Sequence, residues 1–152
     1  MARPVPINEI QRFSQAAWGI QDELVIVAVP TAGDQSLVGK RLNGQTLSVD
    51  GVYTCLIPLS GAFNTLEVHI RATFASGSVT TAGPDSLYFV SNAASPSSWT
   101  VKTSGTGDGA LATTVRQTAT LTGMAGEQYA MVTLTVATSA APLITQAEYN
   151  GY

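Results

Sequence analysis

The chain has 152 residues, of which 45% are hydrophobic and 11% are charged, and its formal net charge is −3. This length suits one domain with a real hydrophobic core, but the charged fraction is far below the roughly 25% of an average soluble protein. Seven basic residues scattered along an acidic chain argue against a nucleic-acid-binding protein, because phosphate-binding surfaces need clustered Lys and Arg. So little charge is typical either of a surface that is covered in the working state or of a neutral β-domain surface.

The first twenty residues differ from the rest of the chain. Pro4 and Pro6 favour an extended, polyproline-like segment. Phe13 then belongs to a set of apolar residues with helical spacing, and Trp18 follows it. We therefore expect residues 1–20 to form an N-terminal arm or a short helix.

The amino-terminal sequence also bears on location. It lacks the apolar core of a secretory signal. The longest apolar run, residues 24–29, is far shorter than the ~20 residues that span a bilayer. We expect a protein that is synthesised in the cytoplasm and has no membrane partner.

Strand and turn signals follow in alternation. The continuous apolar run at 24–29 predicts a buried strand. Asn43-Gly44 and Asp50-Gly51 each predict a tight hairpin turn, because both dipeptides tolerate positive φ. The first turn would join residues 41–42 to 46–49, and residues 52–59 would form the next strand.

The second half of the chain has the clearest strand signal. Residues 65–75 alternate in polarity, with Leu66 and Ile70 on one face and His69 on the other. A period of two is the mark of a half-buried strand. Residues 111–122 and 128–137 repeat the pattern, and the inward candidates of the last strand are Ala130, Val132, Leu134 and Val136.

These elements predict an all-β protein. Two further short strands, at 86–91 and 98–103, are separated by loops rich in Ser, Ala and Gly. About eight short antiparallel strands without a long helix indicate a jelly-roll-like β-sandwich over residues 21–138. The tail, residues 139–152, is expected to be a second, C-terminal arm.

No residue pattern identifies a reaction. His69 is the only histidine and has no ligand set of zinc-site spacing around it. Catalysis by a Ser-His-Asp triad lacks a nucleophile elbow, and no carboxylate pair is distinguished by position. Cys55 lies in an apolar run, where a buried, inert thiol is expected. We assign no catalytic, cofactor-binding or metal-binding residue.

Aromatic residues in the two arms are the candidates for partner binding. Most aromatic residues fall on predicted strands, where core packing is expected. Tyr149 and Tyr152 lie instead in the tail, and an aromatic side chain on an arm is costly to leave in water. The predicted docking residues are Pro4, Pro6, Phe13, Trp18, Tyr149 and Tyr152.

Several segments together resemble a family of virion proteins. They are the run Leu66-Glu67-Val68-His69-Ile70-Arg71-Ala72-Thr73-Phe74, the segments 86–90 and 98–101, and the closing pattern over 115–136. The pattern is similar to β-sandwich proteins of tailed bacteriophages, above all capsid decoration (cement) proteins of the jelly-roll type. The resemblance implies a non-enzymatic homotrimer without a cofactor. Such a protein binds the major capsid protein on the outside of the head, with its arms reaching adjacent subunits.

Two other classes remain open. A carbohydrate- or receptor-binding module would use exposed aromatic residues such as Trp99 in the loops of residues 91–109. Another virion component, such as a head–tail connector or a tail-tube subunit, would also suit the composition. An enzyme is the least supported class, since no acid, base or nucleophile constellation stands out.

Overall fold

The computed structural model describes residues 20–59, 61–81, 88–91, 99–102, 105–106 and 109–152. The expected N-terminal arm lies outside this part of the chain apart from residue 20, and with it the candidate residues Pro4, Pro6, Phe13 and Trp18. The described residues fold into strands and loops, with one 3-10 turn, η1 (Gln35–Leu37). Asp34 caps this turn, because its carboxylate accepts a hydrogen bond of 3.0 Å from the amide of Ser36.

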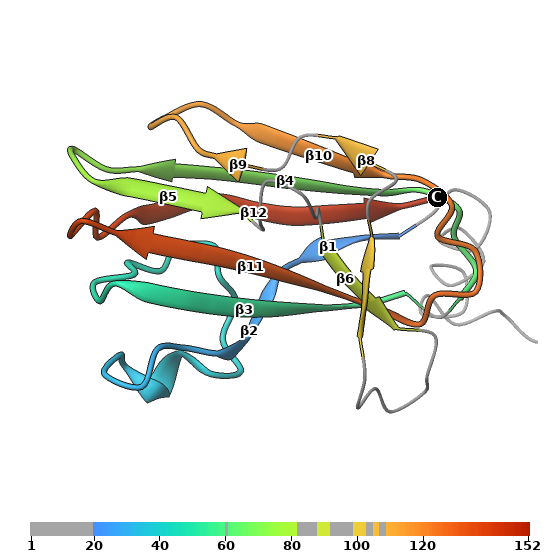
Figure 1. Cartoon of the computed structure of the whole chain (residues 1–152), viewed down its shortest axis with the longest axis horizontal. Coiled ribbons are helices and arrows are strands. Elements are labelled where there is room, and N and C mark those ends of the chain that lie inside the picture. The colour runs from blue at the N-terminus through green and yellow to red at the C-terminus, as the bar shows by residue number, and fades with distance from the viewer. Residues whose placement is uncertain (1–19, 60, 82–87, 92–98, 103–104, 107–108) are drawn as a thin grey trace, which may run out of the picture.

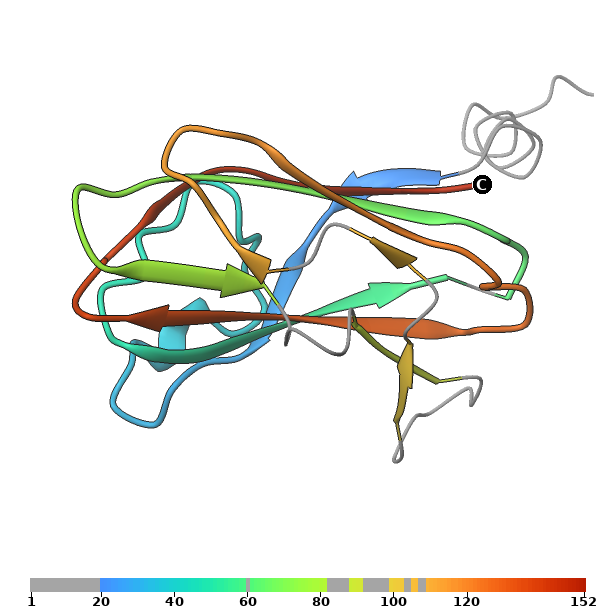
Figure 2. The same cartoon turned by 45° about the horizontal axis from the view of Figure 1, so that its top comes forward.

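Two antiparallel sheets lie face to face (Figures 1 and 2). The first has the order β1-β12-β4-β10-β8, with the bounds β1 Ile20–Glu23, β12 Leu143–Gly151, β4 Leu66–Thr73, β10 Gln117–Leu121 and β8 Gly105–Thr106. The second has the order β2-β3-β11-β5-β9, and its β11 also pairs with β6, which pairs with β7. Its bounds are β2 Val25–Ala28, β3 Gly51–Pro58, β11 Tyr129–Ala137, β5 Ser78–Thr81, β9 Gly109–Ala110, β6 Tyr88–Ser91 and β7 Thr100–Lys102.

The strand order is that of a jelly roll. Antiparallel pairs are nested along the chain: β1 pairs with β12, β3 with β11, β4 with β10, and β5 with β9. Rolling such a set of nested pairs into two layers produces two four-stranded sheets joined by Greek-key connections. The predicted all-β, jelly-roll-like sandwich is therefore confirmed, and β2, β6, β7 and β8 are short additions to its eight main strands.

Alternating side chains from both sheets fill the space between the layers. In β11, the inward candidates Ala130, Val132, Leu134 and Val136 are all buried, as predicted. The apolar positions of β4, such as Ile70, face them from the first sheet, and Tyr53 and Cys55 of β3 belong to the same core. A continuous core of this kind follows from the period-two pattern, because one face of each sheet is shielded from water.

The prediction that residues 139–152 form a C-terminal arm is wrong. Residues 143–151 form β12, a strand between β1 and β4 in the first sheet. Ile144, Ala147 and Tyr149 point into the core and are at most 3% exposed. A register shift between Ile144 and Gln146 breaks the alternation of the strand, because a bulge places one extra residue between inward positions. The sandwich domain therefore continues through the tail instead of ending at residue 138.

The hairpin predicted around Asn43-Gly44 is also absent from the fold. Residues 41–49 pair with other parts of the chain, through isolated bridges from Arg41 to Val25 and from Thr46 to Leu143. Leu42 and Leu47 are fully buried, so they anchor the segment against the core. Burial of these leucines and bonding to distant strands outweigh the local preference of Asn-Gly for a hairpin.

Candidate functional site

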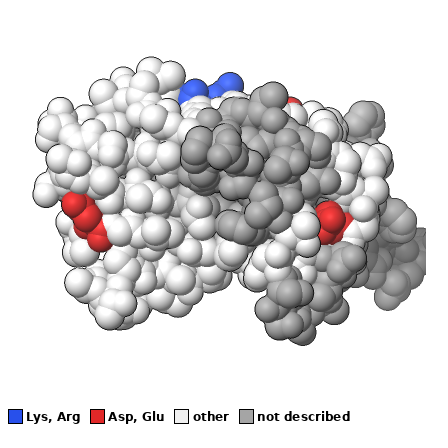
Figure 3. Space-filling view, in the orientation of Figure 1, with Lys and Arg blue, Asp and Glu red and all other residues white. Residues whose placement is uncertain are grey.

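The second sheet is poor in charge, and Lys102 of β7 is the one charged residue in its strands. Strands β2, β3, β5, β6, β9 and β11 contain no Asp, Glu, Lys or Arg. Figure 3 views the molecule from the side of this sheet, and its described surface shows charged atoms only toward the margins. We call the following outward residues the uncharged face: Val25, Val52, Thr54, Leu56, Thr80, Met131, Thr133 and Thr135.

Cross-strand rows make the uncharged face continuous. Leu56 lies opposite Met131 on one side and Val25 on the other, and Val52, which is 48% exposed, lies opposite Thr135. Aliphatic and threonine side chains thus alternate over three adjacent strands. Depletion of charge is the compositional mark of the buried core of a protein–protein interface, whereas acid–base catalysis needs ionisable groups. This face is suited to contact with another protein.

The outward side of the first sheet is polar. It carries side chains of both charges and two side-chain amides. We call the following residues the polar face: Glu23, Glu67, His69, Arg71, Thr118, Gln146, Glu148 and Asn150. The register places His69 opposite Glu148 on β12 and Thr118 on β10. The two outer faces of the sandwich therefore differ sharply in charge.

His69 lies at the centre of a hydrogen-bonded cluster on the polar face. Its Nδ1 is 2.9 Å from Oγ1 of Thr118, and its Nε2 is 3.2 Å from the side-chain amide of Asn150 and 3.5 Å from Oε2 of Glu67. His69 is only 8% exposed, although it lies on the outward, polar side of its strand. The reason is that β4 is a central strand, and side chains of both neighbouring strands cover the imidazole.

The two candidate tyrosines lie on opposite sides of the first sheet. Tyr149 is 3% exposed and belongs to the core. Burial, with a smaller effect of the nearby Asp22, raises its pKa to about 12. The prediction that Tyr149 docks on a neighbouring subunit is therefore wrong, because its ring packs inside its own domain. Tyr152 is 53% exposed, and the hydrogen bond from its hydroxyl to Glu67 raises its pKa.

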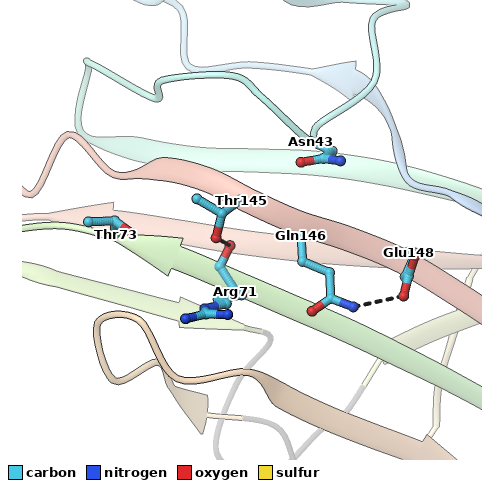
Figure 4. A pocket seen from close by; sticks show the side chains of 6 residues that line it. All are labelled: Asn43, Arg71, Thr73, Thr145, Gln146 and Glu148. Atoms are coloured by element: carbon cyan, nitrogen blue, oxygen red, sulfur yellow. Dashed lines mark hydrogen bonds between the residues drawn. The ribbon is translucent and has the colours of Figure 1, made fainter.

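A polar groove of about 530 Å³ lies beside the His69 cluster. In Figure 4, β12 and β4 run side by side through it, and the loop that carries Asn43 lies on the other side of β12. The Nε2 of Gln146 donates a hydrogen bond of 2.7 Å to Oε1 of Glu148. The groove is lined by Asn43, Arg71, Thr73, Thr145, Gln146 and Glu148.

The sequence brings only two of these groove residues, Arg71 and Thr73, onto one face of a predicted strand. Arg71 and Thr73 could be assigned to one strand face from the alternation of residues 65–75. Gln146 and Glu148 could not, because the tail was expected to be an arm instead of a strand beside β4. A polar alternation within residues 143–151 was the available signal, and the bulge interrupts it.

The remaining candidates for a chemical role are the Cys55 thiol, possible metal ligands and Trp99. Cys55 is fully buried, as expected, and burial raises the pKa of its thiol to about 12, so the thiol stays protonated. No group of three or more His, Cys, Asp or Glu able to hold a metal ion occurs among the residues that the structure describes. Within that same part of the chain, no helix is long and apolar enough to cross a membrane. Trp99 is half-buried, and residues 92–98 of its loop lie outside the described part.

Fold and surfaces together define an all-β sandwich of jelly-roll topology with one uncharged and one polar outer face. No protein-family model, no curated protein and no solved structure matches the chain.

Proposed function

We propose that this chain is a structural virion protein that binds the outer surface of a phage capsid and stabilises the shell, using its uncharged face as the contact surface. The observation that carries the proposal is the absence of charged residues from six strands of one sheet. The jelly-roll order and the resemblance to capsid decoration proteins support it.

The uncharged face suits this task energetically. Covering Val, Leu and Met side chains releases the water that hydrates them, at about 25 cal/mol per Å² of apolar area. Covering a charge would instead cost its hydration unless the partner supplied a counter-charge. A stable contact buries about 800 Å² on each partner, and the accessible surface of the chain is 8111 Å². About a tenth of its surface is therefore enough.

Stabilisation of the shell follows from mass action. A protein that binds the assembled lattice and not free capsid subunits shifts the equilibrium toward the lattice. In a homotrimer, three weak contacts act together through effective concentration. The N-terminal segment, residues 1–20, is proposed to contact adjacent capsid subunits through Pro4, Pro6, Phe13 and Trp18. The exposed Tyr152 is a further proposed contact.

One experiment tests contact and partner together. The purified chain is weighed by light scattering and then sedimented with empty heads of the phage that encodes it. We expect a small oligomer that co-sediments with heads. Thr133→Lys should weaken this binding at least about tenfold, because it buries an unpaired charge in the contact. Thr120→Lys is the matched control, because Thr120 lies on β10 of the first sheet opposite Glu67 of the polar face, and this variant should bind like the unmodified chain.

The outcomes separate the proposal from its competitors. A monomer with no affinity for heads would overturn it, and so would full binding by a folded Thr133→Lys variant. Rings or tubes formed by the chain alone would favour a connector or tail-tube subunit instead. Circular dichroism of both variants confirms that the comparison is made between folded proteins.

A further inference from the structure

The groove on the polar face offers hydrogen-bonding groups of both kinds. The Arg71 guanidinium forms no hydrogen bond or ion pair with the described part of the chain, so its donors face the groove unused. The Nε2 of Gln146 is taken by Glu148, which leaves the Gln146 carbonyl oxygen free to accept. The Nδ2 of Asn43 donates to Glu23 at 3.3 Å, which likewise leaves the Asn43 carbonyl oxygen as an acceptor.

The charges in the groove cancel. Arg71 contributes one positive charge and Glu148 one negative charge, and no other ionisable residue lines the groove among the residues that the structure describes. Glu23, near its rim, is already paired with Arg41 at 2.9 Å. An anionic ligand would gain from Arg71 but be repelled by Glu148, and a cationic ligand would meet the opposite conflict. A neutral ligand is repelled by neither Arg71 nor Glu148.

The volume and the lining of the groove further restrict the chemical class of ligand that it can bind. A volume of about 530 Å³ lies within the ~300–1,000 Å³ typical of small-molecule sites. The described lining of the groove consists of amide, guanidinium, carboxylate and hydroxyl groups and includes no aromatic or large aliphatic side chain. An apolar ligand would leave these groups desolvated and unpaired. A ligand dense in hydroxyl groups can donate to the three carbonyl and carboxylate acceptors while it accepts from the guanidinium.

We propose that this groove is a binding site for a neutral saccharide, held between Arg71 on β4 and Gln146 and Glu148 on β12. The site is independent of the uncharged face, because the groove residues point outward from the other sheet. A protein attached to a surface through the uncharged face would therefore keep the groove open to solvent.

The test is a saccharide titration of the isotopically labelled chain, in which NMR follows the chemical shifts of the backbone amides. The probes are maltotriose, cellotriose and triacetylchitotriose at millimolar concentration, where weak saccharide sites fill. We expect at least one probe to shift amides of Arg71, Gln146 and Glu148 and to leave the uncharged face unchanged. Arg71→Ala should weaken that binding about tenfold or more, because it removes hydrogen bonds from a charged donor.

A control variant and a charged probe test whether the binding belongs to the groove and requires a neutral ligand. Thr135→Ala, on the uncharged face, should bind the saccharide like the unmodified chain. Binding of glucuronic acid with no response to the neutral probes would overturn the neutral assignment in favour of an anion site. No shift at the groove with any of the three neutral probes, or shifts confined to the other sheet, would also overturn it. Capsid binding by Arg71→Ala should remain intact, so failure of this site is distinguishable from failure of the proposed function.

Discussion

The hydroxyl of Tyr152 donates a hydrogen bond of 2.8 Å to Oε1 of Glu67, although 85 residues separate the two in sequence. Their backbones are joined beside this contact, because the Tyr152 amide donates to the carbonyl of Thr65 at 2.9 Å and the Thr65 amide donates to that of Tyr152 at 2.8 Å. The segment that was expected to be an arm is therefore an integral part of the first sheet.

Deletion of residues 142–152 should abolish folding. The deletion removes β12, which pairs with both β1 and β4, and takes Ile144, Ala147 and Tyr149 from the core. We expect loss of the cooperative urea transition and of dispersed amide resonances. The matched control, Tyr152→Phe, keeps the strand and should change the unfolding midpoint only slightly, because the lost hydrogen bond lies at the surface. A truncated chain that still unfolds cooperatively would contradict the role of β12.

Gly77→Ala should destabilise the fold strongly. Gly77 has φ of +81°, and an added Cβ would lie 2.7 Å from the carbonyl oxygens of Ala137 and Thr138. The change therefore adds a collision with backbone to the roughly 1–2 kcal/mol that an L-residue loses in the left-handed region. Gly44→Ala is the control, since φ there is +85° with nothing within 4 Å of the added Cβ. Urea denaturation should rank Gly77→Ala well below Gly44→Ala, and equal stabilities would refute the collision.

Leu134→Ala should lower the free energy of unfolding by about 2–5 kcal/mol, because it leaves a cavity at a fully buried position of β11. Val52→Ala, at a 48% exposed position of the uncharged face, should change it by about 0.5 kcal/mol or less. Chemical denaturation of both variants measures the difference. A costly Val52→Ala would mean that the uncharged face is covered within the chain itself.

Stability should fall at alkaline pH, in part through Tyr149. Its pKa rises from 10.0 to about 12 on folding, so the folded state favours the protonated phenol. The resulting stabilisation is complete below pH 10 and is lost as pH rises through about 12. Tyr149→Phe should therefore show a shallower alkaline decline of its urea midpoint than the unmodified chain. Cys55 shifts in the same direction, from 9.0 to about 12, so some decline should persist in the variant. Identical pH profiles for the two proteins would contradict the assignment.

Strands whose alternation is uninterrupted could be located from sequence. β4 and β11 were predicted nearly to their ends, because period-two polarity is a local property that a half-buried strand requires. β12 was missed, since the bulge before Gln146 puts its inward residues out of phase. The Asn43-Gly44 hairpin was a false prediction, because Leu42 and Leu47 are held by burial and by bonds to other strands.

The sequence by itself determined an all-β chain with sparse charge, because composition and alternation are written into neighbouring residues. Only the tertiary structure decided how that charge is distributed. Strand pairing places Glu67, Arg71 and Glu148 on the outer side of one sheet, whereas six of the seven strands of the other sheet contain no charged residue. Pairing joins residues tens of positions apart, and the free energy of burying both inner faces together selects it. The uncharged face and the polar groove are therefore products of the fold.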